Sequence, residues 1–287
     1  NINANNVWSA TFEPYNTEPE DYRVVFSPDK AEFIRKDGSI ETHTQVVVSP
    51  EDNAEIRKLT LTNNGEHSRT LELTSYLEVV LAHPDADIAH PAFNNLFVTT
   101  EYIPEYHSLI AVRRPRSAHQ KPIWALHTLT VEGEVVGDLQ YETDRSKFIG
   151  RNRDLSHPLA MDVDQPLSNT VGAVLDPIMS LRQRVKIRPG QSCRIAYTLA
   201  VAESREDALV LADKYRDGRV VERAFEFAWN RSQIETAYLA INSRDMEICL
   251  QIIPHILFCR TDQTSVGEQY QGKQQGSAWP VALWHIR

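Results

Sequence analysis

The stretch LTLTNNGEHSRTLELTSYLEVV, residues 59–80, carries the pattern that decides the fold. Two leucines alternate with threonines at its start, and Leu71, Leu73, Ser75, Leu77 and Val79 again step by two, all but Ser75 of them apolar. This period of two is typical of a β-strand with one buried face. The break Asn63-Asn64-Gly65 between the two runs is typical of a β-hairpin with a loop longer than the tightest kind. The stretch therefore predicts two paired antiparallel strands.

The same alternation continues on both sides of this stretch. Residues 40–48 alternate until Ser49-Pro50 ends the run, and residues 181–187 and 195–201 repeat the pattern around Arg188-Pro189-Gly190-Gln191. Many strand-like segments in succession, with no helix between them, predict antiparallel sheets packed on one another. We expect a mainly β fold, with an antiparallel β-sandwich domain over residues 1–203.

The apolar period changes at Ser204. Ser204 and Asp207 have the spacing of a helix N-terminus, where side-chain oxygens accept hydrogen bonds from free amide groups. Apolar residues then recur every three or four positions, which predicts a short helix to Tyr215, a second helix with a stripe from Val220 to Ile241, and a third from about Asp245. We expect a helical linker over 204–259 and an irregular, glutamine-rich tail over 260–287.

Composition excludes several classes of function. The net charge of −9 opposes a nucleic-acid partner, which would need clustered lysine and arginine. The sequence contains neither a run of about 20 apolar residues nor a signal-peptide pattern, so we expect no membrane contact. Cys193, Cys249 and Cys259 are odd in number and lack metal-ligand spacing, which favours a reducing compartment and no disulfide framework. We expect a cytoplasmic location, no metal and no cofactor.

Several strings occur in an order that resembles a known family. They are Asp87-Ile88-Ala89-His90-Pro91-Ala92-Phe93, Tyr141-Glu142-Thr143-Asp144-Arg145 and Thr170-Val171-Gly172-Ala173-Val174-Leu175-Asp176-Pro177. Over about residues 22–258 the chain resembles glycoside hydrolase family 94, formerly glycosyltransferase family 36. It is more similar to the cyclic β-1,2-glucan synthases than to the phosphorylases of that family. The resemblance implies a galactose mutarotase-like supersandwich followed by a linker that leads to an (α/α) barrel.

The family resemblance also implies a function. In the family the general acid is an aspartate of the barrel, beyond the last residue of this chain, so we nominate no catalytic residue and expect the chain to be inactive alone. The chain would supply scaffold, homodimer contacts and part of a sugar-binding rim. Its partner would be a β-glucan or oligosaccharide, and inorganic phosphate would be a co-substrate of a full-length phosphorylase. The location would be the cytoplasm or the cytoplasmic part of an inner-membrane synthase.

The best candidate for a functional loop is the segment 141–153, which places alternating charges around Phe148. Long ordered loops on sandwiches often carry recognition. Arg145 and Arg151 could bind sugar hydroxyls or phosphate, and Phe148 could pack on a sugar face. The alternative is a salt-bridged surface loop. In family 94 dimers a sandwich loop reaches toward the active site of the neighbouring subunit, so the resemblance favours the functional interpretation.

Two other functions stay open. An aldose mutarotase-like enzyme would need a histidine acid and a carboxylate base in one cleft, for which His127 and Glu142 are conceivable. A carbohydrate-binding module would need an aromatic platform; the candidates are Trp8, Tyr102, Tyr106, Trp124 and Trp229, of which we interpret Trp124 and Trp229 as structural. The loop His83-Pro84-Asp85-Ala86-Asp87-Ile88-Ala89-His90 contains metal-binding residue types, but we interpret it as structural.

Overall fold

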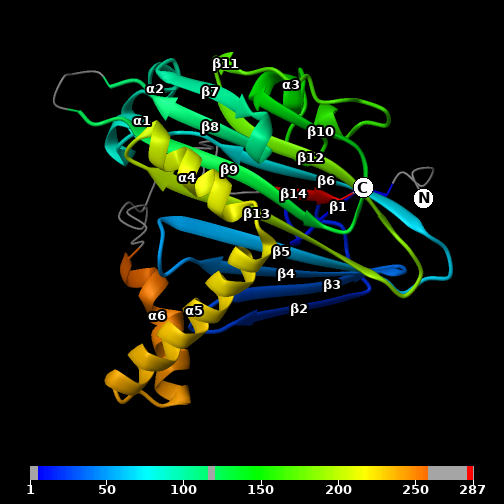
Figure 1. The fold of residues 1–287 in the computed structure, drawn as a ribbon, viewed down its shortest axis with the longest axis vertical. Helices are drawn as coiled ribbons and strands as arrows, with labels where there is room; N and C mark the ends of the chain where they lie inside the picture. The colour runs from blue at the N-terminus through cyan, green and yellow to red at the C-terminus, as the bar shows by residue number, and fades with distance from the viewer. Residues whose placement is uncertain (1–5, 116–119, 258–282, 287) are drawn as a thin grey trace, which may run out of the picture.

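The computed structural model of the 287-residue chain describes residues 6–115, 120–257 and 283–286. It consists of two antiparallel sheets packed face to face, with helices over the larger sheet and short helical segments at one end (Figure 1). The prediction of a mainly antiparallel β fold followed by helices is therefore confirmed.

The larger sheet has nine strands in the order β11-β7-β8-β9-β13-β5-β4-β3-β2. The bounds of these strands are Gly172–Ala173, Val98–Ile103, Ser108–Arg113, Ile123–Glu132, Ser192–Ala202, Ala54–Asn63, Ile40–Val48, Ala31–Asp37 and Asp21–Phe26. The smaller sheet has the order β1-β14-β6-β12-β10, with bounds Trp8–Ser9, Leu283–Ile286, Arg69–Glu78, Pro177–Ile187 and Glu134–Asp144. Strand β14 lies within residues 260–287, which were expected to be irregular, so that expectation is wrong for residues 283–286. The other residues of this segment lie outside the described residues.

The main core fills the space between the two sheets. Leucines of β5 and β6 that alternate in the sequence, such as Leu59, Leu61, Leu71 and Leu73, are buried there. Their polar neighbours point to the opposite face of each sheet, because successive side chains of a strand alternate in direction. Burying this much apolar surface between sheets is the main stabilising contribution in such a fold.

The predicted hairpin between the strands of residues 59–80 is wrong. Strand β5 lies in the nine-stranded sheet and β6 in the five-stranded sheet, so the Asn-Gly connection crosses between sheets. Asn63 makes this corner: its Nδ2 donates to the carbonyls of His67 at 2.8 Å and Ile187 at 3.0 Å. Its main chain also exchanges hydrogen bonds with Gly190 and Gln191, at the second crossing, from β12 to β13. Two sheet crossings therefore share one buried amide.

The helices follow the sandwich, as expected. They are α4 Arg205–Tyr215, α5 Gly218–Tyr238 and α6 Ser243–Leu257. The Ser204 Oγ accepts from the Asp207 amide at 3.0 Å, which confirms the predicted helix start. Small apolar residues of α5, Val221 and Ala224 among them, pack with α4 on the outer face of the nine-stranded sheet.

The far end of α5 departs from the predicted stripe. The buried residues of this helix are Val221, Ala224, Ala228 and Ser232, whereas Ile234 is 69% exposed and Tyr238 is 88% exposed. The helix therefore contacts the sheet near its start and extends past the sheet toward its end (Figure 1).

Candidate functional site

The connection from β10 to β12 covers the outer face of the five-stranded sheet. It begins with α3, Arg145–Ile149, and contains the short 3-10 helix η2, Leu159–Met161. Phe148, Ile149, Ala160 and Leu167 pack there against outward-facing residues of the sheet. We call residues 145–176 the roof segment. A long connection with its own small core is a defined structure and not a free loop.

A buried carboxylate holds the roof segment at one side. Glu142 on β10 is 1% exposed, and its Oε1 accepts from the amides of Thr143 and Asp144 at 3.0 and 3.1 Å. Its Oε2 accepts from the Ser168 hydroxyl at 2.6 Å and the Ser168 amide at 3.2 Å. Hydrogen bonds to a charged acceptor are worth more than neutral ones, about 1.5–3 kcal/mol each. Glu142 therefore fastens the end of the roof segment to the strand where it begins.

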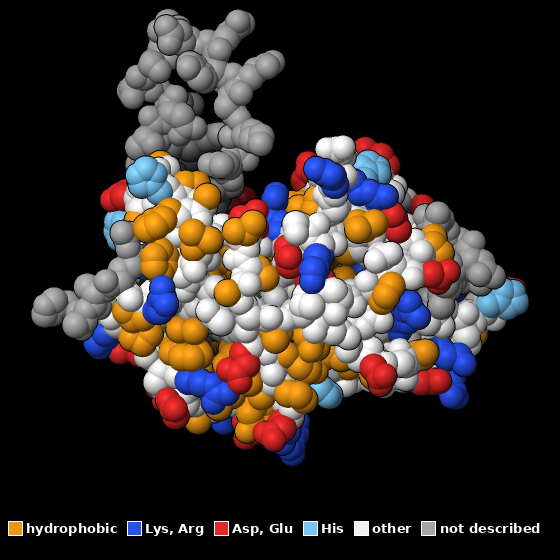
Figure 2. Space-filling model, turned by 90° about the horizontal axis from the view of Figure 1, so that it is seen from above, with side chains coloured by type: hydrophobic (Ala, Val, Ile, Leu, Met, Phe, Trp, Pro, Cys, Tyr) orange, Lys and Arg blue, Asp and Glu red, His pale blue; other side chains and the backbone are white. Residues whose placement is uncertain are grey.

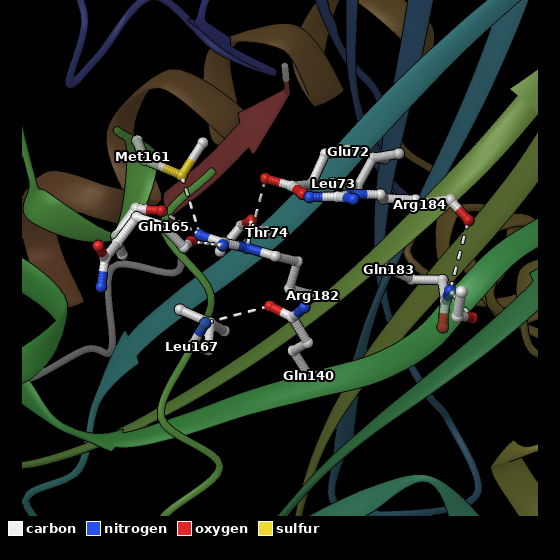
Figure 3. Close-up of polar contacts among 12 residues, drawn as sticks. Glu72, Leu73, Thr74, Gln140, Met161, Gln165, Leu167, Arg182, Gln183 and Arg184 are labelled. Carbon is white, nitrogen blue, oxygen red and sulfur yellow. Dashed lines mark hydrogen bonds and ion pairs between the residues drawn. The ribbon is translucent and has the colours of Figure 1, made fainter. Parts of the chain in front are cut away.

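A buried guanidinium holds the middle of the roof segment. Arg182 on β12 donates to the Gln165 carbonyl at 2.8 Å and to the Ala160 carbonyl, and its Nε donates to Thr74 Oγ1 at 2.9 Å. The carboxylate of Glu72 lies 3.6 Å from the Arg182 Nε and supplies the opposite charge. Figure 3 shows Arg182 between Thr74 and the roof residues Met161 and Gln165. The buried charges of Arg182 and Glu72 therefore lie beside each other, which lowers the free-energy cost of burying them.

Arg145 and Phe148, two of the sequence-predicted site residues, lie near each other at the base of the roof segment. Arg145 donates from its Nε to Glu78 Oε1 at 2.9 Å, and its side chain is 43% exposed. Tyr76 donates to the same Glu78 oxygen at 2.7 Å and packs on the Phe148 ring with centroids 4.9 Å apart. Burial, and then the Glu78 carboxylate, raise the pKa of Tyr76 far above its ordinary value, so its hydroxyl stays a neutral donor.

Phe148 itself is 0% exposed. Its ring is enclosed by the small core beneath the roof segment, so the expected packing on a sugar face does not fit this placement. The ring instead anchors α3 to the sheet, as a large buried aromatic side chain does.

Arg151 lies beyond α3, on the exposed side of the roof segment. Its neighbours Asn152 and Arg153 are also exposed, and Arg153 donates to Asp162 at 2.7 Å. Within the described ranges, the Arg151 side chain has no hydrogen-bond or ion-pair partner from the protein. A guanidinium held on an ordered segment with its donors open to solvent can bind hydroxyl or anionic oxygens in pairs.

The structure separates the two residues that a mutarotase-like mechanism would need to share a cleft. His127 lies between the sheets, where its Nε2 is 2.8 Å from the Ser75 hydroxyl and its ring stacks on Tyr197. Glu142 lies opposite Ser180, on the outer face of the five-stranded sheet. The sheet stands between the two groups, so they cannot act on one substrate. This geometry argues against the mutarotase alternative.

The aromatic candidates do not form one platform. Trp8 is buried in the main core, and Tyr102 stacks on Tyr141 with centroids 4.1 Å apart. Trp124 and Tyr106 pack against the helix-covered core. Trp229, interpreted from sequence as structural, is 54% exposed on α5.

The histidine- and aspartate-rich loop forms the helix α1, Pro84–Ala89, and its flanks. His83 caps the helix by accepting from the Asp85 amide. Among the residues the structure describes, no cluster of three or more His, Cys, Asp or Glu side chains could hold a metal ion.

Sequence reasoning missed the groups that hold the roof segment. Arg182, Glu72 and Ser168 carried no motif. In the sequence, the only available sign was that charged residues such as Arg182 alternate with uncharged residues along β12. The structure shows that Arg182 points away from the main core and is nevertheless buried. Such positions require a covering segment with polar partners.

Comparison with known proteins gives the family. The model of the supersandwich domain of glycosyl hydrolase 94 matches residues 1–218. The chain belongs to glycoside hydrolase family 94. The expected family is thereby confirmed, and with it the expected supersandwich fold.

Three curated relatives show how the family-94 chain compares with longer proteins. It is 32% identical to the cyclic β-(1,2)-glucan synthase NdvB of Rhizobium meliloti (strain 1021) over 96% of this chain and 10% of the relative. It is 20% identical to the N,N'-diacetylchitobiose phosphorylase of Vibrio proteolyticus over 76% of this chain and 26% of the relative. It is 23% identical to the solabiose phosphorylase of Paenibacillus borealis over 86% of this chain and 31% of the relative. The chain thus spans a tenth to a third of the length of these relatives.

The helices of this family-94 chain give one further observation. Within the described residues, none combines the length and the apolar character needed to cross a membrane.

Proposed function

We propose that this chain is the supersandwich part through which a family 94 enzyme holds a β-glucan or oligosaccharide, with Arg145 and Arg151 in the sugar-binding rim. The observation that carries the proposal is the roof segment, which is fastened by Glu142 and Arg182 yet leaves the Arg151 guanidinium open. A pre-organised site loses less conformational entropy on binding than a mobile loop would. The sugar-related names of the relatives support a saccharide as the ligand.

The chain's role in this proposal is non-catalytic. Cleavage of a glycosidic bond needs a carboxylic acid that can reach the leaving oxygen. The two most buried glutamates of the five-stranded sheet, Glu72 and Glu142, are occupied in holding the roof segment. We therefore assign the bond-breaking acid to a part of the enzyme other than these residues, and propose no cofactor. Inorganic phosphate would enter as a co-substrate if the enzyme is a phosphorylase.

Two copies of the chain are proposed to pair, and to do so in the cytoplasm. The pairing is supported by the exposed apolar end of α5, where Ile234, Tyr238 and Leu239 are all more than half exposed. The location is supported by Cys193 and Cys249, which are free thiols. Light scattering during gel filtration tests the pairing: a monomeric mass at micromolar concentration would contradict it.

The proposed rim is tested by calorimetric titration of the chain with a β-1,2-linked glucose oligosaccharide. Arg151→Ala removes the open guanidinium and should weaken binding about tenfold, since paired hydrogen bonds from a charged donor are lost. Arg194→Ala is the matched control, because Arg194 is an exposed, ion-paired arginine on the other sheet. Equal affinities of the Arg151→Ala variant and the wild type would contradict the role of Arg151. The same preparations should release no glucose 1-phosphate from the oligosaccharide and phosphate.

A further inference from the structure

Strand β10 carries a large bulge opposite β12. Val136 pairs with Arg184 and Gln140 pairs with Arg182, so three residues of β10 lie opposite the single residue Gln183. Gly137 adopts φ +74° in this bulge, and nothing lies within 4 Å of the position that a Cβ would take. The backbone therefore turns away from its partner strand and leaves a hollow, as β-bulges at sheet edges do.

The hollow is a cavity of about 50 Å³ on the outer face of the five-stranded sheet. We call it the bulge cavity. Its lining residues are Glu72, Val136, Gly137, Asp138, Gln140, Arg182 and Arg184. Figure 3 shows Glu72, Gln140, Arg182 and Arg184 around this region, on β6, β10 and β12. Polar groups from three strands therefore converge on one small volume.

Some of the polar atoms that line the bulge cavity already make hydrogen bonds to the protein, and others do not. Arg182 uses all three of its nitrogens on Thr74 and the roof segment. Arg184 uses its Nε on Glu72 Oε2 at 2.6 Å, and Gln140 uses its Oε1 on the Leu167 amide at 3.1 Å. Among the described residues, the two terminal nitrogens of Arg184, the Gln140 Nε2 and the Asp138 carboxylate contact no protein partner. The cavity thus offers donors and an acceptor together.

The charges at the bulge cavity decide between classes of ligand. The two guanidinium groups, Arg182 and Arg184, are matched by the two carboxylates, Glu72 and Asp138. A site with balanced charge has no net attraction for phosphate or for a metal cation. Adjacent fixed donors and acceptors instead match a pair of neighbouring hydroxyl groups, each of which donates and accepts. A neutral polyol therefore fits better than an ion.

The size of the cavity sets how much of a polyol enters. A volume of about 50 Å³ is what one or two water molecules occupy in liquid water. Two hydroxyl groups fit, and a whole pyranose ring does not. Val136 lines the mouth and is 37% exposed, so it can contact the C–H face of a ring that stays outside.

We propose that the bulge cavity binds the vicinal hydroxyl groups of one glucosyl unit of a β-glucan, as a subsite separate from the Arg145 and Arg151 rim. The choice of glucose among polyols rests on the proposed function. The separation follows from β6, where Glu72 at the bulge cavity and Glu78 beside Arg145 are six residues apart. At about 3.3 Å per residue this is about 20 Å, which is longer than one sugar unit. One glucan chain can therefore cross the roof segment and touch both places.

The test is a nuclear magnetic resonance titration of the 287-residue chain with sophorose, the β-1,2-linked glucose disaccharide, and separately with inorganic phosphate. The signals to follow are the Gly137 amide and the Arg184 Nε–Hε group, assigned by its loss in Arg184→Lys. The expected result is a saturable shift of both signals with sophorose and none with phosphate. Arg184→Ala should weaken this binding about tenfold, because two donors are lost.

Arg188→Ala is the matched control, since Arg188 follows β12 and is paired with Glu134 outside the cavity. It should leave the sophorose shifts of the Gly137 amide unchanged. A melting curve of each variant establishes that it is folded. The proposal is overturned if sophorose causes no saturable shift, if Arg184→Ala and Arg188→Ala behave alike, or if phosphate alone shifts the signals. Arg151→Ala separates the two sites: loss of rim binding with intact Gly137 shifts would support a separate subsite, whereas loss of the Gly137 shifts in this variant would contradict the separation.

Discussion

Replacing His127 with glutamine should reduce the loss of stability that the chain suffers on mild acidification. His127 is 1% exposed between the sheets. Desolvation by burial, and then the nearby Arg57 guanidinium, lower the pKa of His127 from 6.5 to about 3. The imidazole is therefore neutral in the folded chain at every pH above about 3, whereas in the unfolded chain it binds a proton below about pH 6.5.

The sign and size of the effect follow from this difference. Below about pH 6.5 the unfolded state gains free energy by binding the proton and the folded state does not, so stability falls as the pH falls. At about pH 5 this difference amounts to about 2 kcal/mol, a figure that requires the folded pKa to lie below about 5. The loss continues down to about pH 3, where the folded state also takes up the proton.

The assay is urea unfolding of the wild type and His127→Gln at about pH 7 and about pH 5. Glutamine cannot bind the proton, so its variant should lose about 2 kcal/mol less between the two conditions. Ser75→Ala is the control, because it removes the hydroxyl beside His127 Nε2 and leaves the imidazole in place. It should lower stability at both pH values and keep the wild-type difference. An unchanged pH difference in His127→Gln would contradict a neutral, buried imidazole at about pH 5.

Three further substitutions test the fastening of the fold. Glu142→Gln turns an amide donor toward the backbone amides and Ser168, and should lower the free energy of unfolding by about 3 kcal/mol in chemical denaturation. Gly150→Ala should cost about 1–3 kcal/mol by the same assay, since Gly150 has φ +85° and a Cβ there would lie 2.8 Å from the Leu159 Cβ; an unchanged midpoint would contradict this. Asn63→Ala leaves the carbonyls of His67 and Ile187 without their donor, the second of these bonds being buried, and should lower the melting temperature by several degrees, about 2 kcal/mol in free energy.

Local patterns predicted the strands and the helix start, because both depend on neighbouring residues. The alternation of residues 40–48 and the Ser204 cap are seen in the structure as expected. That β5 and β6 join different sheets was not predictable from these local patterns. A period of two places side chains on the faces of a strand, but it does not tell which sheet the strand joins. Here the buried amide of Asn63 holds a crossing between sheets in place of a hairpin.

The long connection that forms the roof segment was predictable from the sequence, whereas its packing was not. A long connection with arginines around an aromatic residue pointed to the roof segment, and Arg151 is exposed there. The inward position of Phe148 depends on Tyr76, which is distant in the sequence. The bulge cavity depends on a shift of register between β10 and β12, which leaves no mark in the sequence beyond Gly137. Contacts between segments distant in the sequence determine both the position of Phe148 and the bulge cavity.

We propose above all that the roof segment is an ordered sugar-binding surface. Hydrogen–deuterium exchange of the chain, with and without a β-1,2-linked glucose oligosaccharide, tests it most directly. We expect slow exchange of the Ser168 and Leu167 amides in the free chain, because both donate to side chains of β10. The oligosaccharide should slow exchange around Arg151 and Gly137. Rapid exchange across residues 145–176, with no protection by the oligosaccharide, would contradict it.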